Sequence, residues 1–122
     1  MASQTTMGTI LILDDDLGFA MWLGRALNDS GFPALPACTS EEVLAMVSEG
    51  HFEAIDLVIV NFEVDGSQQL LDTLAVYSRG FKVIGIDGSG ARAVEATLQR
   101  PMGQTPPSAE QYLQIVRGVL QR

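Results

Sequence analysis

The sequence predicts a doubly wound α/β domain built on a five-stranded parallel sheet. Short apolar runs typical of buried parallel strands alternate with segments whose apolar residues recur at helical spacing. Two of these runs stop abruptly at polar residues: residues 10–13 run into three aspartates, and residues 55–60 run into Asn61. The carboxyl ends of parallel strands open into the ligand crevice of such folds, so we expect a site there. At 122 residues the chain has the size of one domain.

The segment after the first strand predicts a helix and then an edge strand. Apolar residues recur at helical spacing over residues 19–27, and Gly31 is a typical residue for the end of that helix. Pro33 and Pro36 follow, and each removes a backbone donor from a sheet ladder. The strand at residues 33–37 is therefore expected at an edge of the sheet.

The middle of the chain predicts a further helix, strand, helix and strand. Thr39 and Glu42 have the spacing of a capping box, which opens a helix that stops near Gly50. The remaining elements are the strand at residues 55–60, a helix at residues 70–77 and a strand at residues 83–86.

Two interpretations fit the segment after Asp87. In the first, residues 97–99 form the last strand, but about eight residues then remain for a parallel crossover that usually needs about a dozen. In the second, residues 90–99 form a crossover helix, residues 102–105 form a short last strand, and Ser108 caps the final helix. We prefer the second interpretation because it supplies the crossover.

Composition and charge limit the partners and the compartment. The formal charge of −8 opposes binding to nucleic acids and to anionic lipid, so a protein or a cation is the expected partner. Cys38 is the only cysteine, and the sequence has neither a signal-peptide pattern nor a membrane-spanning apolar run, which favours the cytoplasm. We expect residues 1–8 to be a disordered segment and residues 9–122 to form the domain.

The acids after the first strand and Asn61 after the third resemble the receiver domain of bacterial two-component response regulators. In that family, acidic residues after the first strand hold Mg²⁺, and an aspartate after the third strand accepts a phosphoryl group. The resemblance implies the flavodoxin-like receiver fold with strand order 2-1-3-4-5, here with a shortened fourth helix region. The second strand is an edge in that order, which agrees with the proline pattern.

The resemblance also assigns roles to individual residues. Asp14 and Asp15 match the acid pair, with Asp15 expected as the direct metal ligand and Asp14 acting through water. Asn61 stands at the phosphoacceptor position, where its amide has the shape of aspartate but is a poor nucleophile. Asp87 stands where the family has a hydroxyl residue, and its charge would repel a phosphoryl group.

The family's lysine has no counterpart, because the only lysine, Lys82, lies at the opposite end of the fourth strand. Thr105-Pro106 takes the family's Lys-Pro position in the interpretation that we prefer, and Arg100-Pro101 takes it in the other. The residues expected to line the pocket beside the acid pair and Asn61 are Asp16, Glu63, Asp87 and Thr105.

The missing lysine has an electrostatic consequence. Asp14, Asp15 and Asp87 should converge, and two charges about 4 Å apart repel by about 4 kcal/mol at an effective dielectric of about 20. Either a cation lies among them or at least one carboxylate has a raised pKa. Arg100 supplies that cation only in the disfavoured interpretation. Asn61 could offer a carbonyl oxygen to a metal, so weak Mg²⁺ binding is the most that we expect.

The sequence therefore predicts an atypical receiver that lacks the phosphoacceptor aspartate, has no catalytic residues and signals through phosphorylation-independent protein contacts. The implied partners are a histidine kinase, an output domain, another regulator or a second copy of the chain. The last helix, with Gln111, Tyr112 and Arg117, is the expected docking face.

Two alternatives remain open. One is a phosphorylatable receiver that uses another acid, such as Asp15 or Asp87. The other is a small metal-dependent phosphatase, because residues 13–18 weakly resemble the nucleophile motif of haloacid dehalogenases. That family needs a lysine late in the sheet and usually a cap, which argues against it.

Overall fold

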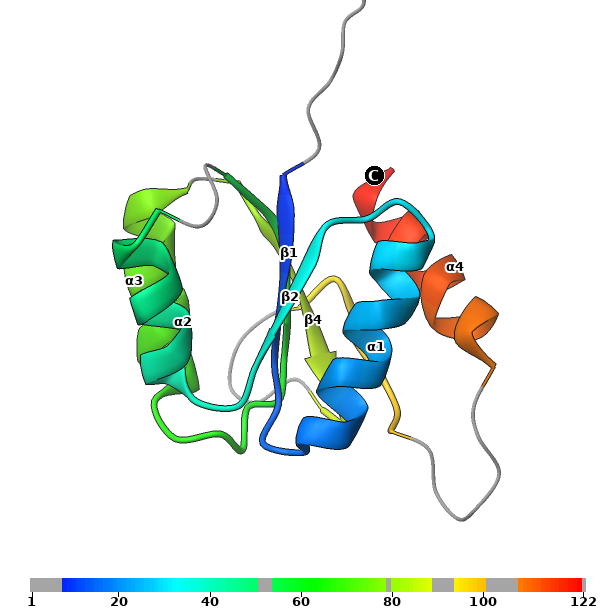
Figure 1. Ribbon diagram of the computed structural model, residues 1–122, viewed down its shortest axis with the longest axis horizontal. Coiled ribbons are helices and arrows are strands. Elements are labelled where there is room, and N and C mark those ends of the chain that lie inside the picture. The colour runs from blue at the N-terminus through cyan, green and yellow to red at the C-terminus, as the bar shows by residue number, and fades with distance from the viewer. Residues whose placement is uncertain (1–7, 51–53, 79, 89–93, 101–107, 122) are drawn as a thin grey trace, which may run out of the picture.

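The computed structural model describes residues 8–50, 54–78, 80–88, 94–100 and 108–121. Its five parallel strands form one sheet in the order β2-β1-β3-β4-β5, so the predicted fold class and strand order are confirmed (Figure 1). The strands are β1 (Thr9–Leu13), β2 (Ala34–Ala37), β3 (Ile55–Val60), β4 (Lys82–Ile86) and β5 (Ala96–Leu98).

Helices cover both faces of the sheet (Figure 1). One face carries α1 (Leu17–Asp29) and α4 (Ala109–Leu120), and the other carries α2 (Ser40–Ser48) and α3 (Ser67–Tyr77). Successive strand residues point to opposite faces, so Ile10 and Ile12 pack with one pair of helices while Leu11 and Leu13 pack with the other. Continuous apolar strands are therefore required in the centre of this sheet.

Local signals in the sequence set several boundaries correctly. The capping box is formed, because Thr39 accepts from the Glu42 amide and the Glu42 side chain accepts from the Thr39 amide. Strand β2, which contains Pro36, lies at an edge as predicted. Ser108 occupies the N-cap position of α4, but its side chain makes no capping hydrogen bond.

The preferred interpretation of the last strand was wrong. Strand β5 is Ala96–Leu98 and pairs with β4, so the predicted helix over residues 90–99 is contradicted where the structure describes it. The predicted strand at residues 102–105, with Thr105, lies outside the described residues. The usual crossover length did not apply, because β5 has only three residues and lies directly beside β4. A connection to so short a neighbouring strand needs fewer residues than usual. Asp87, with φ of 59°, leaves β4 in a left-handed turn.

Within the described ranges, none of the helices is both long enough and apolar enough to cross a membrane.

The two N-caps predict different responses to mutation. Thr39→Ala should lower the free energy of unfolding by about 1 kcal/mol, because it removes one half of a formed capping box. Ser108→Ala is the matched control and should cost less than about 0.5 kcal/mol, since that hydroxyl makes no capping hydrogen bond. Urea unfolding of both variants is the measurement, and equal losses would contradict the capping assignment.

Candidate functional site

Four strands deliver polar residues to the carboxyl edge of the sheet. Asp14 follows β1, Asn61 follows β3, Asp87 follows β4, and Arg100 lies two residues after the end of β5. Asn61, Asp87 and Arg100 line a cavity of about 430 Å³, together with Asp15, Phe62 and Glu63. The parallel sheet therefore gathers the predicted residues because all four strands end on the same side.

Asn61 is buried, and hydrogen bonds fix both ends of its amide. Its Nδ2 donates to Asp14 Oδ1 at 3.1 Å, and its Oδ1 accepts from the Glu63 backbone amide at 2.9 Å. The side chain is not a free ligand, because its carbonyl oxygen already has a donor. Its N–H group points at the acid pair, a position from which a carboxylate would repel Asp14.

Asp14 is a fully buried carboxyl group. Its Oδ1 accepts from Asn61 Nδ2 and from the Asp16 backbone amide, and it lies 3.4 Å from Arg100 Nη1. Its Oδ2 is buried without a hydrogen-bond partner. Burial raises the pKa of this carboxyl group, although the hydrogen bond from Asn61 and the nearby arginine oppose the shift.

Arg100 is the cation of the site, and only the disfavoured interpretation placed it there. Its Nε donates to Asp87 Oδ2 at 2.8 Å, while its backbone amide donates to Asp87 Oδ1 at 2.8 Å. Its Nη1 lies 3.8 Å from Asp16 Oδ2 as well as close to Asp14. We expected either a cation among the acids or an acid with a raised pKa. Both occur, because Arg100 lies among the acids and the pKa of Asp14 is raised.

Asp87 points at Arg100 from an unusual backbone conformation. Its φ of 59° is left-handed, which aspartate tolerates and a β-branched residue such as threonine does not. Burial acts to raise the pKa of the Asp87 carboxyl group, but hydrogen bonds and charge from Arg100 outweigh burial, so the pKa is lowered. Arg100 therefore holds Asp87 as a carboxylate.

The remaining predicted site residues fall into different places. Asp15 and Glu63 are exposed and line the cavity. Asp16 accepts from the Phe19 amide as the N-cap of α1, a structural task that an acid after a strand can also perform. Lys82 lies at the far end of β4, as predicted, where its Nζ donates to the Val119 carbonyl oxygen.

Tyr112 is a correction to the expected docking face. It is 6% exposed, and its hydroxyl donates to the Gln99 carbonyl oxygen at 2.6 Å. Its ring also lies edge-on to Trp22 and Phe19 of α1. Tyr112 is a core residue between α1, α4 and the end of β5, and it offers little surface to a partner. Apolar spacing along the last helix could have indicated this burial.

The residues fit a divalent cation poorly. Hard cations take a shell of oxygen ligands, and the unpartnered Asp14 Oδ2 is one such atom. However, Asn61 turns a donor toward Asp14, and the Arg100 guanidinium already contacts the same carboxylate. Among the described residues, no group of three or more acidic, histidine or cysteine side chains has a geometry that could hold a metal.

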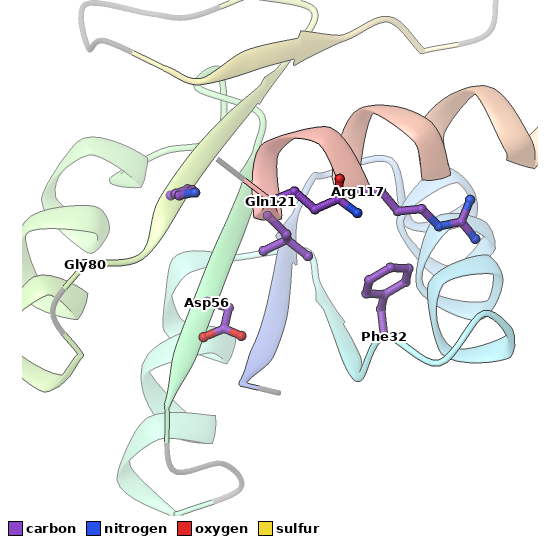
Figure 2. A pocket seen from close by; sticks show the side chains of 7 residues that line it. Phe32, Asp56, Gly80, Arg117 and Gln121 are labelled. Carbon is purple, nitrogen blue, oxygen red and sulfur yellow. The ribbon is translucent and has the colours of Figure 1, made fainter. Parts of the chain in front are cut away.

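A larger cavity, of about 520 Å³, lies at the opposite end of the sheet (Figure 2). Two of its charged groups lie apart, because the Arg117 guanidinium points away from Asp56. Asp56 accepts from the Gly8 amide, while Arg117 pairs with Glu110 and lies over the Phe32 ring. We therefore take the smaller cavity, lined by Asn61, Asp87 and Arg100, as the candidate site.

Asp14→Asn should raise the free energy of unfolding at pH 7, because it removes a buried charge and keeps the acceptor for Asn61. The pKa of Asp14 is raised above 3.8, so the folded state binds this proton more tightly than the unfolded state. Burial of the ionised Asp14 lowers the free energy of unfolding of the wild type, and this loss disappears as the pH falls through the folded pKa toward 3.8. The difference in free energy of unfolding between the variant and the wild type should therefore shrink over that pH range.

Urea unfolding at a series of pH values measures this difference, and Asp65→Asn controls for the loss of an exposed acid at the same edge. If Asp14→Asn is the less stable protein at pH 7, the contact with Arg100 outweighs burial.

Solved structures similar to this fold are receiver domains. No family model matches the chain, and no curated protein matches its sequence. The receiver domain of the hybrid histidine kinase CckA is 26% identical, with a TM-score of 0.72, and the match covers 93% of this chain and 100% of that one. A CheY-like receiver domain protein from Methanospirillum hungatei is 20% identical, with a TM-score of 0.71 and 95% of each chain covered.

A response regulator from Thermotoga maritima is 19% identical, with a TM-score of 0.69, and the match covers 96% of this chain and 100% of that one. These likenesses extend over nearly the whole chain and agree with the observed strand order. The chain therefore has the fold of a response regulator receiver domain.

Proposed function

We propose that this chain is an atypical receiver domain that signals through protein–protein contacts without being phosphorylated. The observation that carries the proposal is Asn61, which stands at the end of β3 with both ends of its amide hydrogen-bonded. Phosphoryl transfer to a side chain needs an anionic oxygen in line with phosphorus, and an amide held in this way supplies none.

The neighbours of Asn61 support the same proposal. A phosphoryl group at this edge would meet the carboxylate of Asp87, whose pKa is lowered by Arg100. The guanidinium that could bind such a group is already engaged by the carboxylates of Asp87 and Asp14. The site thus has one cation of its own, supplied by the chain, and that cation is already paired with acids.

The proposed partners are proteins of two-component signalling: a histidine kinase, an output domain, another regulator or a second copy of this chain. Negative charge disfavours nucleic acid and membrane surfaces, and a cytoplasmic location is part of the proposal. Exposed apolar side chains that a protein could cover occur on α1, as Leu17 and Met21, and at the end of α3, as Val76 and Tyr77.

Acetyl phosphate with Mg²⁺ should leave the protein unmodified, because the chain offers no competent acceptor at Asn61. Intact mass spectrometry is the measurement, with an active receiver treated in parallel as the positive control. A stoichiometric gain of one phosphoryl group would contradict the proposal and favour an acceptor such as Asp15 or Asp87. Turnover of a phosphate ester would instead favour the phosphatase alternative.

Asn61→Asp alone should also remain unphosphorylated. The new carboxylate would place an oxygen where Nδ2 now lies, 3.1 Å from Asp14 Oδ1, and the two acids would repel. Phosphorylation should appear only when Asp87→Ser removes the opposing charge and Arg100→Lys supplies a mobile ammonium group. Serine is used because its unbranched side chain suits the left-handed backbone better than threonine.

The control for this triple variant is the Asp87→Ser, Arg100→Lys double variant, which keeps Asn61 and should gain no phosphoryl group. A stable, Mg²⁺-dependent aspartyl phosphate on the single Asn61→Asp variant would show that Asp87 and Arg100 do not block the site.

A further inference from the structure

The acidic edge of the sheet has a cation of its own. We propose that the Arg100 guanidinium is the built-in counter-ion of the acid pocket, defined as Asp14, Asp15, Asp16 and Asp87, and that it excludes divalent cations from this pocket. The inference rests on the proposed function and deepens it. Arg100 supplies the positive charge that a metal ion would otherwise bring to these acids.

The first support is geometric. One guanidinium reaches acids that follow two different strands: Nε is 2.8 Å from Asp87 after β4, and Nη1 is 3.4 Å from Asp14 after β1. The same Nη1 lies 3.8 Å from the carboxylate of Asp16. A planar fork suits such multiple contacts better than a point charge, which is why arginine and lysine are not equivalent here.

The second support is the competition for Asp14. A divalent cation at this edge would need carboxylate and carbonyl oxygens, yet Asp14 Oδ1 already faces Arg100 Nη1, Asn61 Nδ2 and the Asp16 amide. A metal on this carboxylate would lie within a few ångströms of the guanidinium charge, and the two cations would repel. Removal of the guanidinium should therefore open the pocket to a metal.

Arg100 also lies on a main-chain connection between the acid pocket and α4, which provides a readout for the experiment. Its backbone amide donates to Asp87 Oδ1, and the carbonyl oxygen of the preceding residue, Gln99, accepts from Tyr112 of α4. The Tyr112 ring lies 5.6 Å from the Trp22 ring, measured between centroids. Trp22 is the only tryptophan of the chain, so its fluorescence reports on this connection.

The experiment compares wild type with Arg100→Gln and with the control Arg117→Gln. Each variant loses one positive charge, but Arg117 pairs with Glu110 on α4 and is not part of the acid pocket. Mg²⁺ and Mn²⁺ are titrated at matched ionic strength, and the readouts are the melting temperature, by circular dichroism, and Trp22 fluorescence. A metal that binds mainly the folded state raises its melting temperature by mass action.

We expect Mg²⁺ to bind Arg100→Gln at least about tenfold more tightly than it binds wild type or Arg117→Gln, and only Arg100→Gln to gain thermal stability from it. The Trp22 spectrum of metal-free Arg100→Gln should differ from that of wild type, and the metal should shift it back. Equal metal affinities of the two variants would overturn the inference, and so would saturation of wild type by millimolar Mg²⁺.

The result is informative even if Arg100→Gln does not fold alone. Folding on addition of Mg²⁺ or Mn²⁺ supports the inference, whereas failure to fold at saturating metal overturns it, because a metal then cannot replace the guanidinium. These outcomes are separate from the proposed function, which fails if the wild-type protein accepts a phosphoryl group or turns over a phosphate ester.

Discussion

The buried carboxyl group of Asp14 is the constraint on which the site depends. It lies at the end of a central strand with no exposed surface, where an ionised acid is costly unless donors surround it. The chain supplies the amide of Asn61, a backbone N–H and the edge of the Arg100 guanidinium, yet one oxygen stays unpartnered. The described neighbours of Asp14 Oδ1 are therefore all donors, as a buried carboxylate requires.

The parallel sheet explains how residues far apart in the sequence meet this demand. Strands β1, β3, β4 and β5 end on one side, so a single polar residue after each is enough to assemble the network. The apolar strands hold these ends in place because helices cover both faces of the sheet. The short strand β5 places Leu98 in the core, and the contacts of Arg100 and Gln99 connect the end of the strand to β4 and α4.

The sequence predicted the parts of this fold that depend on local patterns. The alternation of strands and helices, the edge position of the proline-containing strand and the Thr39 capping box follow from periodicity, missing donors and cap chemistry, whereas the strand order was implied by the resemblance to receiver domains. The last strand was misplaced because a typical crossover length was applied to a three-residue edge strand. Because of that error the role of Arg100 was missed, since it depends on where the strand ends. Tyr112 was misjudged although it lies on the apolar face of the last helix, where it packs against α1.

The residues at positions 61, 87 and 100 depend on one another. An amide at position 61 can donate to Asp14, which an aspartate could not do while ionised. A carboxylate at position 87 suits both the left-handed backbone and the guanidinium of Arg100, and threonine would suit neither. A change at Asn61 or Asp87 alone, to aspartate or threonine respectively, would leave an unpaired charge or a strained residue. Asn61, Asp87 and Arg100 are therefore better described as one network around Asp14 than as independent features.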